Sequence, residues 1–237
     1  MKKYKRKRRG EGSSYWQSYS DMMAALLLMF ILIMSFTILH SLSSYEQQKK
    51  LLDEQQEKLE KLVGVKSDII QDLSLEFEDT SLSISVDPQT GAIAFDSNVL
   101  FDYNQVELKS TAKEFLNEFM PLYLEVLLSE SYEPYLSEII VEGHTDDNGS
   151  YIYNLDLSQK RALSIATYFI EEGEAILDKE QLEGLREILT ANGRSWSNLI
   201  YNTDGTVNDD ESRRVEFKFR LKDDEMIEEM KNILEEQ

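Results

Sequence analysis

Two side chains in the segment 141–170, VEGHTDDNGSYIYNLDLSQKRALSIATYFI, could act together as a binding pair. Asp146 follows an apolar stretch with the pattern of a buried strand, and Arg161 lies in an amphipathic stretch that predicts a helix. A carboxylate and a guanidinium a few ångströms apart can hold a ligand that carries an ammonium group beside a carboxylate, because arginine donates to carboxylates in a bidentate fork. Taken singly, Asp146 has the pattern of a turn residue and Arg161 that of a solvated helix residue, so only their joint spacing predicts a site.

A third chemically capable residue, Asp21, stands at the entrance of an uncharged apolar run, MMAALLLMFILIMSFTIL (22–39). Three interpretations are open. Ser20 or Asp21 could cap the N-terminus of a helix, where the positive end of the helix dipole favours an anion. Asp21 could instead pair with a partner helix, or it could carry an ion by taking up and releasing protons when partner subunits bury it.

Other kinds of chemistry find little support. The chain has two histidines, His40 and His144, and no cysteine, so we predict neither an enzyme nor a bound metal or other cofactor. His144 is expected to be a packed residue at the end of a strand. The segment NTDGTVNDDE (202–211) spaces oxygen donors at alternate positions, as calcium loops do. It lacks the terminal bidentate Glu at the expected place, which favours a solvated acidic hairpin.

The charge distribution separates a short basic tail from a strongly acidic remainder. The net charge is −20, yet residues 1–21 hold seven of the 25 basic residues and only two of the 45 acidic ones, and residues 22–42 hold none of either kind. Binding to nucleic acid needs clustered Lys and Arg, so the acidic remainder argues against it. By the positive-inside rule, the basic tail places the N-terminus of a membrane helix in the cytoplasm.

The apolar run is long enough to cross a bilayer. With Tyr15, Trp16 and Tyr19 in front of it, the segment 15–42 is predicted to be a transmembrane helix that follows a cytoplasmic tail at 1–14. A cleaved signal peptide is the alternative, but the run exceeds the usual signal core and is followed by a poor cleavage site. We expect an uncleaved, single-pass anchor in the inner (cytoplasmic) membrane, with the C-terminal part in the periplasm.

Residues 43–74 are polar, contain no proline and are rich in strong helix formers, which predicts a helical neck. A weak heptad seam runs through this segment at Tyr45, Leu52, Leu59 and Leu62. Because Gln48 and Gln55 interrupt the seam, the pairing of two necks in a homodimer and a solvated single helix both stay open.

From about residue 75 the pattern changes from helical periodicity to alternation, and strands then interleave with helices. Such an order predicts one α/β domain at 75–237, in which helices pack against a mixed sheet. Residues 87–91, DPQTG, predict a turn. The predicted strands are 81–86, 92–95, 136–143 and 213–221, and the predicted helices are 107–128, 157–172, 179–190 and 223–236.

The segment 141–170 resembles the peptidoglycan-binding signature of OmpA-like domains, in which a strand ends in Gly-His-Thr-Asp and is followed at fixed offsets by Gly, Tyr-Asn, Leu-Ser and Arg-Ala. The stretches VLFDYNQVELK (99–109) and SRRVEF (212–217) match the same family, so the resemblance covers about residues 95–221. Ser212 departs from the Asn usual in this family, and the segment 171–211 is longer and more acidic than expected.

The resemblance implies that the domain binds peptidoglycan. Diaminopimelate, an amino acid of the peptidoglycan stem peptide, carries the ammonium and carboxylate groups that the pair described above would hold, and the family assigns this role to the positions of Asp146 and Arg161. Thr145, Asn154 and Leu155 are expected to complete the pocket.

The order of the parts resembles the B subunit of the flagellar stator family, here termed the MotB/OmpA-like family. A basic tail, Trp16, one Asp in the membrane helix, a helical neck and an OmpA-like domain follow one another. The resemblance implies that Asp21 carries the coupling ion, expected to be a proton. It also implies that a homodimer lies inside a ring of MotA/ZorA-like membrane subunits. Ion flow would rotate this ring, while the outer domain holds the complex to peptidoglycan.

Within this family the very short tail, the short neck and the insertion GRSWSNLIYNTDG (193–205) are most similar to the B components of Zorya anti-phage defence systems. This similarity implies an ion-driven rotary membrane complex that relays phage perturbation of the envelope. A flagellar motor stator subunit and a passive peptidoglycan-binding tether are the alternatives.

Overall fold

The computed structural model describes residues 12–78, 80, 82 and 84–222. Most of the predicted basic tail and all of the predicted helix 223–236 lie outside these residues. The chain divides into two compact units, Met1–Lys58 and Leu59–Gln237, which are treated separately below. The long helix α1, Gly12–Glu78, contributes residues to both units.

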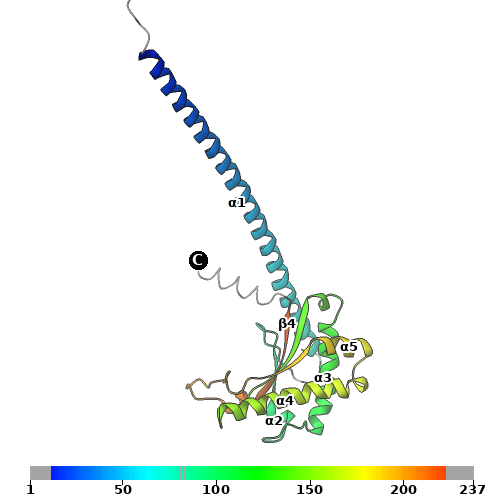
Figure 1. Ribbon diagram of the computed structural model, residues 1–237. Coiled ribbons are helices and arrows are strands. Elements are labelled where there is room, and N and C mark those ends of the chain that lie inside the picture. The colour runs from blue at the N-terminus through cyan, green and yellow to red at the C-terminus, as the bar shows by residue number, and fades with distance from the viewer. Residues whose placement is uncertain (1–11, 79, 81, 83, 223–237) are drawn as a thin grey trace, which may run out of the picture. The chain divides into compact units, whose positions relative to one another are not determined.

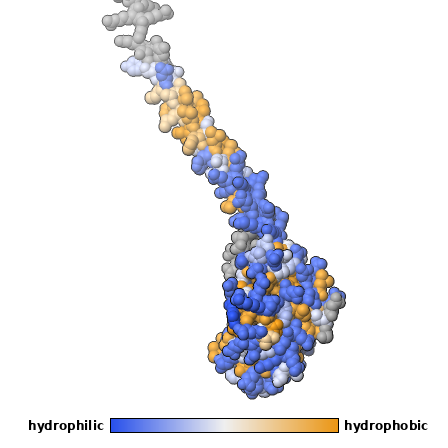
Figure 2. Space-filling view, turned by 90° about the vertical axis from the view of Figure 1, so that its right-hand side faces the viewer, coloured by the Kyte–Doolittle hydropathy of each residue, from blue (hydrophilic) through white to orange (hydrophobic). Residues whose placement is uncertain are grey.

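In the first unit, α1 carries the apolar run with its side chains exposed all round the helix. This helix is long and apolar enough to cross a membrane, and none of its most apolar window, with a mean hydropathy of 2.7, is buried within the protein. Figure 2 shows the run as a hydrophobic band on the helix. A helix that is apolar on every side cannot be satisfied by packing against one core, and a bilayer provides the surroundings that it needs.

The last turns of α1 belong to the core of the second unit. Ile69, Leu73 and Phe77 lie four residues apart on one helix face and are buried. The Phe77 ring stacks on Phe119 at a centroid distance of 5.4 Å. The predicted boundary between neck and domain, at residues 74 and 75, therefore falls inside a helix segment whose apolar face is already part of the domain core.

The second unit contains a four-stranded mixed sheet in the order β1-β4-β2-β3 (Figure 1). The strands are β1 (Ile93–Asp96), β2 (Leu136–Gly143), β3 (Leu189–Gly193) and β4 (Arg214–Leu221). β4 pairs antiparallel with both β1 and β2, whereas β2 and β3 are parallel. The helices and 3-10 turns that accompany the sheet are α2 (Ser97–Leu100), α3 (Ser110–Leu127), η1 (Glu133–Tyr135), α4 (Tyr151–Glu171), η2 (Gly173–Ala175), α5 (Lys179–Ile188) and α6 (Asp209–Ser212).

Helices α3 and α4 cover the same face of the sheet. The buried Phe217 ring of β4 meets Phe119 of α3 edge-on at 4.9 Å and Phe169 of α4 at 6.4 Å, between ring centroids. Side chains alternate between the two faces along β4. Val215, Phe217 and every second residue after them are buried in the core, and the charged residues between them lie on the other face. The predicted arrangement of helices against a mixed sheet is confirmed.

Helix α4 approaches the sheet most closely at two glycines. A Cβ on Gly143, at the end of β2, would lie 2.4 Å from the Ser158 carbonyl oxygen, and a Cβ on Gly193, at the end of β3, would lie 2.4 Å from the Gln159 nitrogen. Only glycine fits such an approach of backbone to backbone. The two glycines thus let the helix lie directly over the carboxyl ends of the parallel strands.

Several predicted elements differ from the observed ones. The predicted strand 81–86 is reduced, among its described residues, to a single bridge between Val86 and Ile93, although the turn at Asp87 is present, with its backbone N–H donating to Ala92. β3 was not predicted. Its sequence, LTANG, shows no alternation, and it becomes a strand because the edge of β2 offers it backbone partners.

Candidate functional site

The predicted binding residues meet at the carboxyl ends of the parallel strands. Thr145 and Asp146 directly follow β2, and the Ser150 side chain caps α4 by accepting from the Tyr153 N–H. Helix α4 begins at Tyr151, earlier than the predicted start at Leu157, because of this cap. The carboxyl edge of parallel strands, next to a helix N-terminus, is where open α/β sheets bind ligands.

Asp146 is nearly buried and is held in place by two donors. Its Oδ2 accepts from Arg213 Nη1 at 2.5 Å and its Oδ1 accepts from the Asn148 N–H at 3.1 Å. Arg213 also pairs with Asp210 on the solvent side. The carboxylate is thus fixed in direction by the backbone on one side and by a guanidinium on the other.

Arg161 is buried to 6% exposure yet makes no ion pair of its own among the described contacts. Its Nε donates to the Gln105 carbonyl at 2.9 Å and its Nη2 to the Asp102 carbonyl at 3.4 Å. The guanidinium lies over the Phe101 ring, 5.1 Å from its centroid. Neutral carbonyls and a ring face orient the guanidinium without cancelling its charge, so its remaining donors are available to an anionic ligand.

The charges of the two residues act on each other across the site. Burial lowers the pKa of Arg161 from its ordinary value, the charge of Arg213 lowers it further, and the negative charge of Asp146 opposes both. A guanidinium remains charged at any physiological pH even so. The site therefore presents the Asp146 carboxylate, which is paired with Arg213, and the Arg161 guanidinium, and these two are neighbours without being each other's partner.

The three remaining predicted residues have different roles in this structure. Asn154 is buried and braces the loop, because its Nδ2 donates to the carbonyls of Asp146 (3.4 Å) and Asn148 (3.0 Å). The Thr145 backbone N–H donates to the Ser195 carbonyl, while its buried Oγ1 has no hydrogen-bond partner among the described residues. Leu155 is half-buried in the first turns of α4.

Arg213 is a site residue that sequence reasoning did not identify. The signal was present in the stretch SRRVEF, where alternation along a strand sends neighbouring arginines to opposite faces. Arg213 pairs with Asp146, whereas Arg214 pairs with Glu216 on the far side of the sheet. Which of the two arginines reaches the site depends on the register between β2 and β4.

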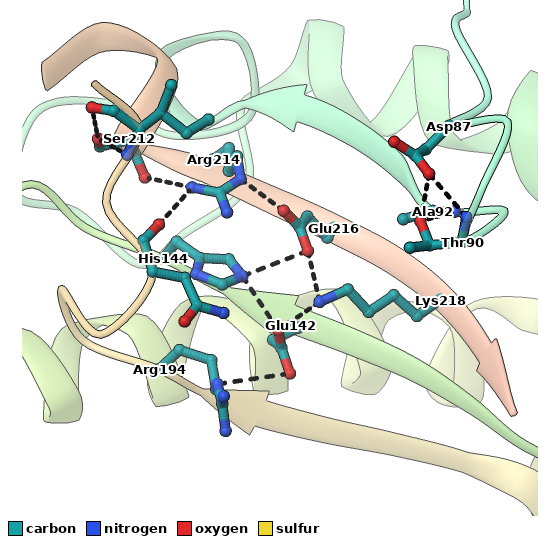
Figure 3. Close-up of polar contacts among 12 residues, drawn as sticks. Asp87, Thr90, Ala92, Glu142, His144, Arg194, Ser212, Arg214, Glu216 and Lys218 are labelled. Atoms are coloured by element: carbon teal, nitrogen blue, oxygen red, sulfur yellow. Dashed lines mark hydrogen bonds and ion pairs between the residues drawn. The ribbon is translucent and has the colours of Figure 1, made fainter. Parts of the chain in front are cut away.

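The face of the sheet away from the helices carries a carboxylate cluster, defined by Glu142, His144, Glu216 and Lys218 (Figure 3). Glu142 and Glu216 are register partners on neighbouring strands, so their like charges face each other. His144 Nε2 lies 3.1 Å from one carboxylate and 3.5 Å from the other. The Lys218 ammonium lies 2.6 Å from Glu142 and 2.5 Å from Glu216.

This cluster offers three donor groups that lie within 4.8 Å of one another, as a metal site does. The Lys218 ammonium already contacts both carboxylates, however, and Arg214 adds a second cation at 2.5 Å from Glu216. A divalent ion would have to displace the ammonium. The cluster thus links β2 and β4 through ion pairs in which cations compensate the two carboxylates. The absence of a bound metal stays a prediction.

The cations also set the acidity of the cluster. Burial alone would raise the pKa of Glu142, but the neighbouring His144 and Lys218, which donates a hydrogen bond to Glu142 and adds its charge, lower it to about 2. The pKa of Glu216 is also lowered against the same effect of burial, by the neighbouring His144 and Lys218 and by the charge of Arg214. Both carboxylates are therefore ionised in the folded protein at neutral pH.

The acidic segment 202–211 uses its oxygens internally. A bridge between Tyr201 and Val207 makes it a hairpin, and Asp204 Oδ1 accepts from both the N–H and the hydroxyl of Thr206. The segment thus forms the expected hairpin, whereas the absence of bound calcium stays a prediction.

Asp21 lies well inside α1, which begins at Gly12, more than two turns earlier. The interpretation of Ser20 or Asp21 as a helix cap is therefore wrong, because the backbone groups that a cap would satisfy lie near Gly12. The Asp21 side chain is exposed on the first unit. Its two other interpretations, pairing with a partner helix and carrying an ion, both stay open.

Two family models match separate parts of the chain. The OmpA family model matches residues 100–213, which include the predicted binding residues and Arg213. Strands β1 and β4 lie outside the match. A model described as membrane MotB of the proton-channel complex MotA/MotB matches residues 1–51, which include Asp21.

Two curated relatives match most of the chain. The Zorya protein ZorB of Escherichia coli O139:H28 is 31% identical over 92% of this chain and 87% of its own. A second Zorya protein ZorB, from Escherichia coli strain Crooks, is 28% identical over 89% of each. Among solved structures, a MotB-like protein from Desulfovibrio vulgaris matches 71% of this chain and 96% of its own at 20% identity, with a TM-score of 0.45.

Proposed function

Since the chain belongs to the ZorB family of Zorya proteins, we propose that it is the peptidoglycan-anchored B subunit of an ion-driven, rotary, stator-like membrane complex that acts in anti-phage defence. It is a single-pass protein of the inner membrane, with its N-terminus in the cytoplasm and its second unit in the periplasm. We assign no enzymatic activity to it.

The observation that carries the anchoring function is the pair Asp146 and Arg161. Each is buried and oriented, and neither neutralises the other. In this proposal the Asp146 carboxylate receives the ammonium of diaminopimelate and the Arg161 guanidinium receives its carboxylate. Arg213 limits how far Asp146 can turn, and the buried hydroxyl of Thr145 has no hydrogen-bond partner among the described residues.

The observation that carries the motor function is Asp21 at the start of the uncharged apolar run of α1. A carboxylate at this depth is costly unless partner subunits surround it, and such residues mark ion pathways in membrane proteins. Two copies of this chain inside a MotA/ZorA-like ring would place it there. The coupling ion in this proposal is the proton, supported by the description of the MotB model that matches this segment.

The anchoring function is tested by sedimentation of the full-length chain, in detergent, with purified peptidoglycan sacculi. We expect Arg161→Ala to lower the bound fraction at least tenfold, since a charge-assisted bidentate contact contributes on the order of 2 kcal/mol. Lys160→Ala is the matched control, because Lys160 is exposed and, among the described residues, pairs with Asp156 along the helix. Unchanged binding of the Arg161→Ala variant would remove the proposed pocket.

A further inference from the structure

Beside the proposed diaminopimelate pocket, the chain exposes an aromatic rim, defined here as Tyr103, Asn104 and Tyr153. Tyr103 is 90% exposed and Tyr153 is 47% exposed. Isolated exposed apolar residues are common and need no explanation. Tyr103 and Tyr153 are not isolated in this sense, because the contacts that orient the pocket residues also fix the position of the rim.

The rim is tied to the pocket on both sides. The two carbonyls that orient the Arg161 guanidinium belong to Asp102 and Gln105, and Tyr103 and Asn104 lie between them in the chain. The Tyr153 hydroxyl donates to Asn104 Oδ1. Tyr153 also lies close enough to Arg161 for the two side chains to interact electrostatically.

The backbone of the rim is held in one conformation. Asn104 has a φ of +59°, in the left-handed region that Asn tolerates better than most residues. Its side chain is bound to Tyr153, which lies in the capped first turn of α4. The loop that carries Tyr103 is thus pre-organised, and the ring is presented to solvent on a supported backbone.

We infer that the aromatic rim binds the sugar backbone of peptidoglycan, next to the stem peptide held by Asp146 and Arg161. This inference rests on the proposed function. Diaminopimelate is the third residue of the stem, so the sugar that bears the stem lies on the order of 10 Å away along the chain of the ligand. A ligand seated in the pocket therefore brings its sugars to the surface around it.

The chemistry of the rim suits a pyranose ring. The face of an aromatic ring carries negative potential, and the C–H groups on one face of a sugar are weakly positive, so the two stack. The phenol hydroxyl of Tyr103 and the amide of Asn104 add donors and acceptors for sugar hydroxyls. Because the sugar contacts involve no ion pair, salt should weaken binding of the charged stem and leave the gain from the sugar largely unchanged.

The test compares two soluble ligands on the full-length chain in detergent, by isothermal titration calorimetry. One ligand is the free stem tripeptide that contains diaminopimelate, and the other is the same peptide attached to its disaccharide. We expect the wild-type chain to bind the second ligand about three- to tenfold more tightly, as one aromatic stacking contact provides. Tyr103→Ala should abolish this difference and leave the affinity for the free peptide unchanged, while Tyr103→Phe should retain it.

Tyr201→Ala is the matched control, since Tyr201 is an exposed tyrosine of the 201–207 hairpin and should not affect either affinity. Equal affinity of the wild-type chain for both ligands would overturn the inference, as would an equal loss for both in Tyr103→Ala. A change of oligomeric state in Tyr103→Ala, measured by light scattering, would identify the rim as a contact between copies of the chain instead. If the wild-type chain binds neither ligand, the proposed function itself fails.

Discussion

At the scale of single residues, Arg161 shows how a charge can be buried and still be available. Two backbone carbonyls and the Phe101 ring orient its guanidinium, and none of them carries a compensating negative charge. The planar, forked shape of the group is needed for all three contacts at once. Charge alone is therefore not sufficient at this position.

Arg161→Lys keeps the charge but loses the fork and the planar contact with Phe101. We expect it to lose about tenfold or more in affinity for the diaminopimelate tripeptide, close to the loss in Arg161→Ala. Calorimetric titration of the full-length chain measures it, with circular dichroism to confirm that the variants are folded. Wild-type affinity in Arg161→Lys would mean that a point charge is enough and that the orientation described here is irrelevant.

The carboxylate cluster predicts a dependence of stability on pH. The pKa of Glu142 is lowered to about 2 in the folded protein, and that of Glu216 is also lowered, whereas an unfolded Glu titrates near pH 4.3. A lowered folded-state pKa stabilises the fold above the unfolded-state pKa, and this stabilisation is lost as the pH falls from about 5 towards 2. Urea unfolding between pH 7 and pH 3 should show the free energy of unfolding decreasing over this window.

Lys218→Met should lower the free energy of unfolding by about 2 kcal/mol at pH 7, because two opposed carboxylates lose their shared ammonium. The difference from the wild type should shrink as the pH falls and the carboxylates become protonated. Lys179→Met is the control, since its pair with Glu183 is exposed and contributes about 0.5 kcal/mol or less. A loss in Lys218→Met that stays constant down to pH 3 would contradict the electrostatic explanation.

At the scale of elements, the position of α4 over the sheet decides where the binding site forms. The helix can lie over the ends of β2 and β3 only because Gly143 and Gly193 have no side chain. This close approach brings the α4 residue Asn154 under the loop after β2, and it sets the distance between Asp146 and Arg161.

Gly143→Ala should destabilise the protein by about 2 kcal/mol, because a Cβ there would lie 2.4 Å from the Ser158 carbonyl and would force α4 away from β2. Gly64→Ala is the matched control with the opposite expected sign. Apart from the backbone of the helix and the chain neighbours, no atom of the described residues lies within 4 Å of a Cβ at Gly64. Gly64 is in the interior of α1, so alanine there should stabilise the helix by up to about 1 kcal/mol. Chemical denaturation monitored by circular dichroism distinguishes the two.

The same displacement of α4 should weaken ligand binding in Gly143→Ala, although Gly143 itself contacts no ligand in the proposed complex. If the variant is destabilised and yet binds the diaminopimelate tripeptide as the wild type does, the spacing of α4 does not control the site.

At the scale of the whole molecule, the chain joins an apolar helix long enough to span a membrane to an OmpA-like domain, and the proposed motor function needs both. A passive tether would need only the second. Asp21 distinguishes these functions, because a tether has no use for a carboxylate within an apolar helix.

Asp21→Asn should abolish protection against phage, because an amide cannot take up and release a proton, and Asp21→Glu should retain part of it. The measurement is the efficiency of phage plating on cells that carry the complete defence system, with immunoblots to confirm equal amounts of protein. Ser20→Ala is the neighbouring control and should protect as the wild type does. Full protection by Asp21→Asn would support the passive tether.

Features that depend on local sequence were predictable. β2 occupies the range that its apolar pattern predicted, and the apolar run forms one helix, because periodicity and side-chain type act over a few neighbouring residues. The offsets between Asp146 and Arg161 were also local, since one strand end, one loop and the start of one helix fix them. Sequence alone therefore predicted the apolar helix and the α/β class, which are confirmed, whereas the binding role of Asp146 and Arg161 stays a prediction.

Features that depend on partners distant in the sequence were decided only by the tertiary structure. Arg213 reaches Asp146 from 67 residues away, and Glu142 faces Glu216, because β2 and β4 pair in one register; a shift by one residue would send every side chain to the other face. The strand LTANG exists because β2 provides its hydrogen-bond partners. Ile69 belongs to the domain core because the end of α1 packs there. The free energies of strand pairing and core packing depend on residues that meet only in the folded chain, so the local sequence pattern does not predict these contacts.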